Sequence, residues 1–270
     1  MSTTQLGYEI APDGTAYDVL RKADAPVVVL IHGLGLCRHM WCEHIADFAT
    51  DYQVVSYDLL GHGDSASPTA STDLSLYAGQ LCGLLDHLQI DKAAIVGFSI
   101  GGMINRRFAL DYADRLSALA ILNSPHDRGD EAQALVESRA TAVRSEGKMA
   151  TMEAALERWF TDGYRTSNPD FMRTVRAWRR KVDAQSYAEA AWVLATGVKE
   201  LTRATAPVNV PTIVITSEYD SGSTPDMALT IASEIDQAEI CIVPELKHLG
   251  LIEQPQSFTG PVVEFFRKFP

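Results

Sequence analysis

Residues 97–101, Gly-Phe-Ser-Ile-Gly, lie between the apolar run Ala93–Val96 and a helix-forming segment that begins at Ile100. The G-x-S-x-G spacing is common by chance, but its position between a predicted strand and a predicted helix makes it specific. A turn this tight needs glycine on both sides and holds its central residue in a strained conformation above the sheet. The start of a helix also favours developing negative charge. The motif therefore predicts that Ser99 is a nucleophile at the edge of an α/β sheet.

Short β-branched runs alternate with helix-length segments along most of the chain. Several runs are apolar without alternation, as expected for strands of a parallel sheet covered on both faces, so the sequence predicts an α/β fold. Asp73 and Ser257 are predicted as helix N-caps. The predicted strands are Tyr17–Leu20, Val27–Ile31, Gln53–Tyr57, Ala93–Val96, Leu119–Leu122, Thr212–Thr216 and Glu239–Val243. The predicted helices between them are Met40–Ala49, Leu74–Leu88, Ile100–Tyr112, Pro225–Ile235 and Ser257–Phe269.

Residues 126–206 break this alternation, because they contain only helix-forming sequence rich in Ala, Glu and Arg. The segment separates two predicted buried strands, and we expect it to form a helical cap, or lid, over the ligand-binding edge of the sheet. The predicted division is a core domain of residues 1–125 and 207–270 and a cap of residues 126–206. The predicted cap helices are Glu131–Ser145, Thr151–Phe160, Asn168–Lys181 and Gln185–Thr196.

The sequence His32-Gly33-Leu34-Gly35 directly follows the apolar strand VVVLI. Glycines at this position allow backbone N–H groups to approach a bound oxygen atom. An acyl-transfer enzyme needs two such donors where the oxyanion of its tetrahedral intermediate forms. We expect these donors to be the N–H groups of Leu34 and Ile100. An ordinary turn is the alternative interpretation of the first motif taken alone.

A nucleophilic serine needs a base, and the base needs a residue that orients it. Of the seven histidines, His248 is the best placed, since it lies in a loop between the last predicted strand and the final helix. Asp220 follows the strand Thr212–Thr216 at the edge where open α/β sheets hold functional residues. Glu218 and Asp127 are alternative acids.

The order Ser99, Asp220, His248 is the nucleophile, acid, base order of α/β-hydrolases and differs from that of chymotrypsin and subtilisin. The chain resembles this fold family over essentially its whole length. The segments that carry the resemblance are HGLG at 32–35, YDLLGHGDS at 57–65, GFSIGG at 97–102, and the surroundings of Asp220 and His248. The resemblance implies an eight-stranded, mostly parallel sheet flanked by helices, with a helical cap after the sixth strand. It also implies Ser–His–Asp chemistry without a metal or an organic cofactor.

More narrowly, the chain is similar to the 3-oxoadipate enol-lactonase group of bacterial aromatic catabolism. The supporting segments are GGMINRRFAL at 101–110, LERWFTDGYRTSNPDF at 156–171 and GSTPDMALTIASEI at 222–235. This resemblance implies a serine hydrolase that cleaves a carboxylic ester or enol-lactone of a small, anionic acid. The chain departs from the family pattern at Ile100, where methionine is frequent, and this substitution keeps the backbone donor.

Three alternatives remain open on the sequence. The first is hydrolysis of a C–C or amide bond in a ring-cleavage product by the same triad, although Phe98 replaces the Asn typical of C–C hydrolases. The second is perhydrolase-like or haloperoxidase-like reactivity. The third is a binding protein that has kept the fold and lost turnover. Serine at position 99, in place of aspartate, argues against haloalkane dehalogenase and epoxide hydrolase chemistry.

The formal net charge of −12 disfavours nucleic acid and anionic membranes as partners, since both require a basic face. Residues 126–206, however, contain 13 Lys+Arg against 12 Asp+Glu. We therefore expect a cap arginine to bind a substrate carboxylate. Arg173, Arg176 and Arg180 share one helical face, for which a solvent-exposed basic stripe is the alternative interpretation. The predicted substrate-binding residues are His32, Gly33, Phe98, Arg128, Trp159, Arg173 and Arg176.

The longest apolar run, Pro26–Ile31, is far shorter than the roughly 20 residues of a membrane-spanning helix. The first ten residues resemble no secretory signal. The four cysteines have no C-x-x-C spacing, which is typical of reduced thiols. We expect a cytoplasmic enzyme with a small-molecule substrate, and the sequence leaves open whether it forms a homo-oligomer.

Overall fold

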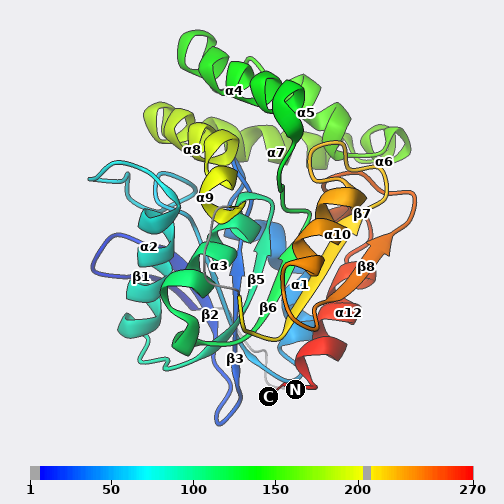
Figure 1. The fold of residues 1–270 in the computed structure, drawn as a ribbon. Helices are drawn as coiled ribbons and strands as arrows, with labels where there is room; N and C mark the ends of the chain where they lie inside the picture. The colour runs from blue at the N-terminus through cyan, green and yellow to red at the C-terminus, as the bar shows by residue number, and fades with distance from the viewer. Residues whose placement is uncertain (1–6, 203–207, 270) are drawn as a thin grey trace.

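A computed structural model describes residues 7–202 and 208–269 (Figure 1). Its strands form one eight-stranded sheet in the order β1-β2-β4-β3-β5-β6-β7-β8. Strand β2 is antiparallel to both β1 and β4, and every pair from β4 to β8 is parallel, which confirms the predicted mostly parallel sheet. The strands are β1 (Gly7–Ile10), β2 (Ala16–Leu20), β3 (Val27–Ile31), β4 (Gln53–Tyr57), β5 (Ala93–Phe98), β6 (Leu116–Leu122), β7 (Thr212–Ser217) and β8 (Glu239–Val243).

The central strands are buried on both faces, as their continuous apolar sequences predict. In the parallel register, Gly97 of β5 lies beside Ile31 of β3, and Phe98 lies beside Leu122 of β6. The carboxyl ends of these neighbouring strands are therefore level. The loops that follow them, which contain most of the predicted site residues, begin at one edge of the sheet.

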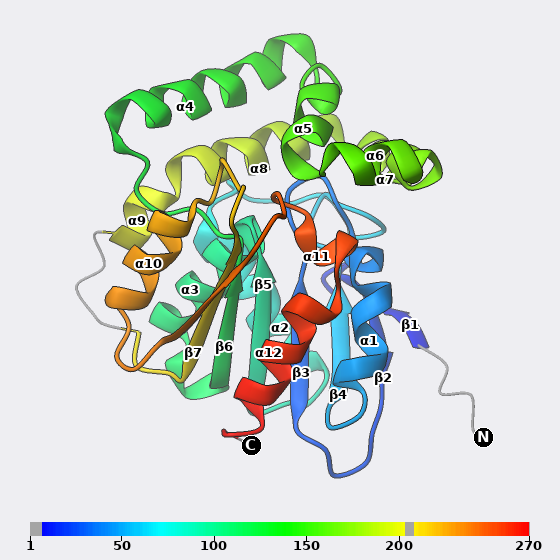
Figure 2. The same ribbon diagram turned by 90° about the vertical axis from the view of Figure 1, so that its right-hand side faces the viewer.

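Helices cover both faces of the sheet (Figure 2). Helices α1 (Cys42–Phe48) and α12 (Gln256–Phe266) pack on one face, and α2 (Leu74–His87), α3 (Ile100–Asp111) and α10 (Pro225–Ser233) pack on the other. The short helices η1 (Arg38–Trp41), η2 (Ala113–Arg115) and α11 (Gly250–Glu253) lie in connections.

One of the two predicted N-caps is confirmed. Asp73 accepts a hydrogen bond of 2.7 Å from the N–H of Leu76 at the start of α2. The prediction for Ser257 is wrong, because α12 begins one residue earlier, at Gln256, and Pro255 occupies the N-cap position.

Between β6 and β7 the described chain forms six helices, which we call the cap helices, and Figure 2 shows them above one end of the sheet. The four predicted helices are present, and two short helices, α6 and α9, are additional. The predicted boundary between the cap and the core, at 206/207, lies outside the described residues. Residues 1–6, which belong to the segment predicted to contain no secretory signal, also lie outside them. The cap helices are α4 (Gly129–Glu146), α5 (Met152–Trp159), α6 (Asp162–Ser167), α7 (Pro169–Lys181), α8 (Ala184–Thr196) and α9 (Val198–Thr202).

Two observations bear on the predicted environment of the chain. All four cysteines are free thiols, and only Cys42 is exposed. In the parts of the chain that the structure covers, no helix combines the length and the apolar character needed to cross a membrane.

Candidate active site

Ser99 occupies the turn between β5 and α3 with φ 58° and ψ −116°, a strained conformation for a residue other than glycine. A Cβ atom at Gly97 would lie 2.2 Å from the carbonyl oxygen of Gly101, and one at Gly101 would lie 2.6 Å from that of Ile31. Both contacts are with backbone, which has little room to move. The turn therefore requires glycine at both positions, as the motif predicts, and presents Ser99 at the sheet edge.

The two predicted oxyanion donors lie just beyond the carboxyl ends of the adjacent strands β3 and β5. Ile100 is the first residue of α3, where backbone N–H groups have no acceptor within the helix. Leu34 follows β3 and lines the same cavity as Ser99. The Ile100 side chain is buried in the core. The replacement of the methionine frequent in the family by isoleucine therefore keeps the backbone N–H donor at the site.

His32 was predicted to bind substrate, but the structure places its side chain away from the cavity of Ser99. Its ring is fully buried and does not line the cavity. Nδ1 lies 2.8 Å from the carbonyl oxygen of Gly33, and Nε2 accepts a hydrogen bond of 2.9 Å from the N–H of Leu59. Burial lowers the pKa of His32 to about 4, so the ring is neutral and donates from Nδ1. His32 therefore holds residues 32–36 in position, and we call this segment the oxyanion loop after the role predicted for Leu34.

Asp220 lies 2.6 Å from Nδ1 of His248, through its Oδ2 atom. The same oxygen accepts a hydrogen bond of 2.9 Å from Asn123, and Oδ1 accepts from the N–H groups of Gly222 and Ser223 at 2.8 and 3.0 Å. Burial would raise the pKa of Asp220, but His248, Asn123 and the Gly222 amide together lower it below its ordinary value. Asp220 is therefore an ionised, rigidly held partner of the histidine.

The two alternative acids lie elsewhere. Glu218 is exposed and accepts a hydrogen bond from the N–H of Glu245. Asp127 is also exposed and accepts one from the N–H of Gly129. Neither is paired with His248, so the geometry favours Asp220 among the three candidates.

A cavity of about 370 Å³ lies between the sheet edge and the cap helices, and Ser99, Asp220 and His248 all line it. The ring of His248 has the ring of Phe98 at 4.9 Å and that of Trp159 at 6.4 Å, measured between centroids. Of the predicted substrate-binding residues, those that line this cavity are Gly33, Phe98, Arg128 and Trp159.

The structure does not bring Arg173 and Arg176, which were predicted to bind substrate, to the cavity of Ser99. Both residues lie in a separate surface groove and not in the cavity of Ser99. Arg173 pairs with Asp170, and Arg176 pairs with Glu153 at 2.6 Å. Arg173 is exposed and Arg176 is half-buried, and this arrangement on the surface of α7 agrees with the alternative interpretation of a basic stripe.

The face of α7 that packs inward contains Met172, Val175 and Arg179, at i, i+3 and i+7. This spacing was visible in the sequence, because the apolar pair Met172 and Val175 marks the buried face and Arg179 continues it. Arg179 was nevertheless missed, and two further cavity arginines, Arg139 of α4 and Arg158 of α5, were also missed. Asn123 was also missed, although its position directly after β6 was a usable signal.

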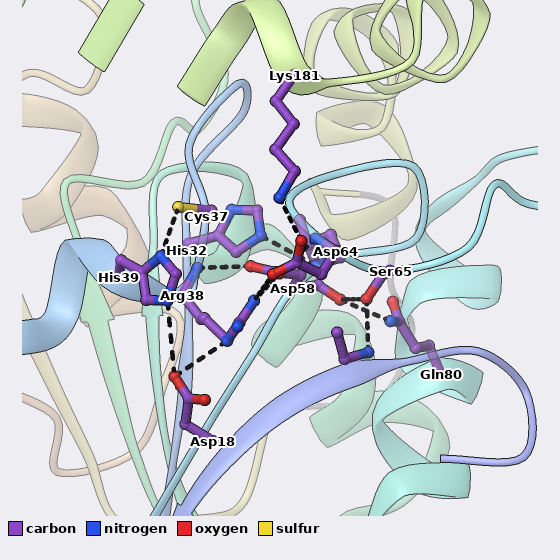
Figure 3. A network of polar contacts seen from close by, with 12 residues as sticks. Asp18, His32, Cys37, Arg38, His39, Asp58, Asp64, Ser65, Gln80 and Lys181 are labelled. Carbon is purple, nitrogen blue, oxygen red and sulfur yellow. Dashed lines mark hydrogen bonds and ion pairs between the residues drawn. The ribbon is translucent and has the colours of Figure 1, made fainter. Parts of the chain in front are cut away.

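A buried ionic network lies behind the oxyanion loop (Figure 3). Arg38 pairs with Asp58, with Asp18 at 3.0 Å and with Asp64 at 2.9 Å, and its N–H donates to Asp58 at 2.7 Å. Asp64 also pairs with Lys181 at the end of α7. The network thus connects η1, β2, the loop after β4 and helix α7, and it accounts for the acidic residues of the YDLLGHGDS segment.

The fold and the site define an α/β-hydrolase. The model of the alpha/beta hydrolase fold family matches residues 26–255, and the chain belongs to this family and is a hydrolase. A 3-oxoadipate enol-lactonase of Acinetobacter baylyi is 28% identical over 94% of this chain and 93% of that protein. The (E)-2-((N-methylformamido)methylene)succinate hydrolase of the same organism is 25% identical over 87% of this chain and 88% of that protein. The crystal structure of the enol-lactonase from Burkholderia xenovorans has a TM-score of 0.85 at 28% identity, and the match covers 97% of this chain and 100% of that one.

Proposed function

We propose that the protein is a serine hydrolase that cleaves a carboxylic ester or an enol-lactone with Ser99, His248 and Asp220 as its catalytic triad. The observation that carries this proposal is the 2.6 Å contact between Asp220 and Nδ1 of His248, in the cavity that Ser99 also lines. Asp220 fixes the imidazole tautomer with its proton on Nδ1, so that Nε2 is left to accept a proton.

The proposed reaction has two stages. Nε2 of His248 takes the proton of Ser99 as Oγ attacks the substrate carbonyl, and the N–H groups of Leu34 and Ile100 bind the resulting oxyanion. His248 then protonates the departing alcohol or enol oxygen, which leaves an acyl-enzyme. A water molecule deprotonated by His248 attacks the acyl carbonyl, and the acid product leaves as Ser99 regains its proton.

The proposed substrate is the ester or lactone of a small acid that carries an additional negative charge. Four arginines line the cavity, whereas Asp220 is its only acidic residue in the described chain. The first relative named above acts on an enol-lactone, and the second on a substituted succinate, which is a dicarboxylate. We further propose a role in the breakdown of aromatic compounds in the cytoplasm.

Hydrolysis of an amide is the second candidate. It is favoured by the similarity to the hydrolase of the N-methylformamido compound, whose name describes an amide group. The same triad serves both reactions, since each proceeds through attack on a carbonyl carbon. A panel of enol-lactones, aryl esters and formamides of equal charge separates the two by their relative kcat/KM.

The serine mechanism is tested by Ser99→Ala. We expect turnover to fall by about 10⁴-fold or more, leaving the residual rate due to the oxyanion donors and substrate binding. A fluorophosphonate probe should label the wild-type protein and fail to label the variant. Substantial hydrolysis by Ser99→Ala, measured on a preparation free of wild-type enzyme, would falsify the mechanism.

A further inference from the structure

The Arg179 side chain in α7 is only 2% exposed, and its guanidinium group is almost without hydrogen-bond partners. Nη1 contacts the hydroxyl of Thr151 at 3.4 Å, and buried Nε has no partner in the described structure. The guanidinium carbon lies 4.9 Å from the ring centre of Trp159 and 5.3 Å from that of Tyr187. The two rings orient the group, yet most of its five N–H donors remain available to a ligand.

Arg139 and Arg158 line the same cavity as Arg179. In residues 7–202 and 208–269, none of the three forms an ion pair with a carboxylate. Burial lowers the pKa of Arg179 and of Arg158, and the charges of Arg139 and Arg179 lower that of Arg158 further. Arg179 is buried, Arg158 is half-buried and Arg139 is exposed. Positive charges gathered around a buried guanidinium group are unfavourable unless an anion compensates them.

Arg128 lines the cavity as well, but its donors are already engaged. Its guanidinium group donates to the carbonyl oxygen of Leu194 at 3.1 Å, and more weakly to Gln133 and to the carbonyl of Ala195. Arg128 therefore binds the C-terminal turn of α8, and it is a weaker candidate for ligand binding than Arg179.

Arg179 lies directly over the oxyanion loop. A Cβ atom at Gly35 would be 3.2 Å from Nε of Arg179 and 2.9 Å from the ring of Tyr187, so a residue without a side chain is needed there. The ring of Trp159, which packs on Arg179, is also 6.4 Å from the ring of His248. A single aromatic ring thus separates this arginine from the catalytic histidine.

We propose that Arg179, assisted by Arg158 and Arg139, forms an anion subsite that binds a carboxylate of the substrate distant from the scissile bond. The proposal rests on the proposed function and adds to it the residue that recognises the negative charge of the substrate. Guanidinium groups bind carboxylates through paired hydrogen bonds, which also orient the ligand. Arg179 is therefore a specificity-determining residue, and Arg128 is not.

The kinetic test compares two aryl esters that present the same bond, p-nitrophenyl acetate and the p-nitrophenyl monoester of succinic acid. In Arg179→Gln, we expect KM for the succinyl ester to rise about 10- to 100-fold, which is the change in affinity expected when a hydrogen bond to a charged group is lost. The acetyl ester should change by less than about 3-fold, because it has no carboxylate. Arg179→Lys should recover part of the loss.

Arg176→Gln is the matched control, since Arg176 lies on the same helix, outside the cavity and paired with Glu153. It should leave both esters unchanged. Arg158→Gln, at a half-buried side chain, serves as a second variant if Arg179→Gln fails to fold, and it should show the same selective rise in KM. Equal losses on both esters, or no loss on either, would overturn the proposal.

A binding measurement separates this proposal from the proposed function. Calorimetry on Ser99→Ala with succinate, succinamide and inorganic phosphate does not depend on turnover. We expect succinate to bind at least about 10-fold more tightly than succinamide, and Arg179→Gln to remove the difference. Phosphate binding as tight as that of succinate would identify a general oxyanion site and contradict carboxylate selectivity. Succinate binding of this kind, combined with a wild-type protein that hydrolyses none of the esters, would retain the subsite and refute the serine hydrolase.

Discussion

At the scale of single residues, the environment of Asp220 decides which oxygen faces the histidine. Oδ1 accepts two backbone N–H groups, from Gly222 and Ser223, whereas Oδ2 accepts from Asn123 and contacts His248. Every partner is a donor, so the carboxylate is held entirely as an acceptor. This arrangement requires an ionised group and fixes the proton of His248 on Nδ1.

Asp220→Asn is expected to lower kcat by about 10³- to 10⁴-fold with little change in KM. The amide oxygen of the asparagine will remain on the two backbone N–H groups, so its NH₂ group will face His248. A donor in that position favours the tautomer with the proton on Nε2, which cannot accept the proton of Ser99. The measurement is steady-state hydrolysis of an aryl ester near neutral pH.

Glu218→Gln is the control for Asp220→Asn, because Glu218 follows the same strand and is exposed. It should retain full activity. If Asp220→Asn kept more than a tenth of the wild-type kcat while Glu218→Gln lost it, the assignment of the acid would be reversed.

Position along the chain was sufficient to predict which loops meet at the sheet edge, whereas the direction of the cap side chains could not be predicted in this way. Ser99, Asp220 and His248 each follow a predicted strand, and the parallel sheet brings all of their loops to one edge. Arg179 was not predicted because arginine is normally exposed, whereas here it lies on the buried face of α7 with Met172 and Val175. Asn123 was missed because its contact with Asp220 joins residues that are 97 positions apart.

At the scale of elements, the turn between β5 and α3 is determined by backbone contacts. The start of α3 lies so close to β3 that Gly101 approaches the carbonyl oxygen of Ile31. Glycines in α2 are different, since a Cβ atom at Gly83 would meet nothing within 4 Å. The same substitution should therefore have opposite effects in the two helices.

Gly101→Ala is expected to lower the free energy of unfolding by about 2–3 kcal/mol or more, because neither backbone can yield to the new methyl group. Gly83→Ala should raise it by about 0.5–1 kcal/mol through lower entropy of the unfolded chain and better helix propensity. Urea unfolding monitored by circular dichroism measures both. Similar effects of the two substitutions would contradict the backbone contact.

The predicted elements agree with the structure where the apolar runs are long, as for β3, β4, β7 and α2. Strand β1 was not predicted from its residues, because Gly7–Ile10 is an edge strand with little buried surface and no apolar run. The start of α12 was misplaced because Ser257 is a good N-cap by residue type, whereas Pro255 stops the preceding turn. Exposed edges and helix ends depend on tertiary context that local sequence does not contain.

At the scale of the whole molecule, three buried histidines connect stability to pH. Burial lowers the pKa of His32 to about 4, that of His44 to about 4 and that of His62 to about 3. The rings of His32 and His62 lie 5.3 Å apart beneath the active-site loops, and His44 contacts Thr259 between α1 and α12. Burial thus disfavours protonation of histidine at two separate places in the core.

The sign of the effect follows from proton binding. Each histidine titrates near pH 6.5 in the unfolded chain and near 4 or below in the folded protein, so the unfolded chain binds more protons between these values. The free energy of unfolding therefore has its full value above about pH 6.5 and falls as the pH decreases towards 4. Each histidine contributes a loss of about 2 kcal/mol between pH 7.5 and pH 5.

Urea unfolding curves between pH 7.5 and pH 5 test this linkage, because the three losses together approach the total stability of an ordinary domain. His44 is distant from the oxyanion loop, and His44→Gln should reduce the change in the free energy of unfolding between pH 7.5 and pH 5 by about a third. His39→Gln, at an exposed side chain, is the matched control. Stability that stayed constant from pH 7.5 to pH 5 would show that these histidines bind protons as readily in the folded protein as in the unfolded chain. A slope that His44→Gln left unchanged would show the same for His44. The inference that the folded protein keeps these histidines neutral below pH 6.5 would then be refuted. The fixed tautomer of His32 under the oxyanion loop would be refuted with it.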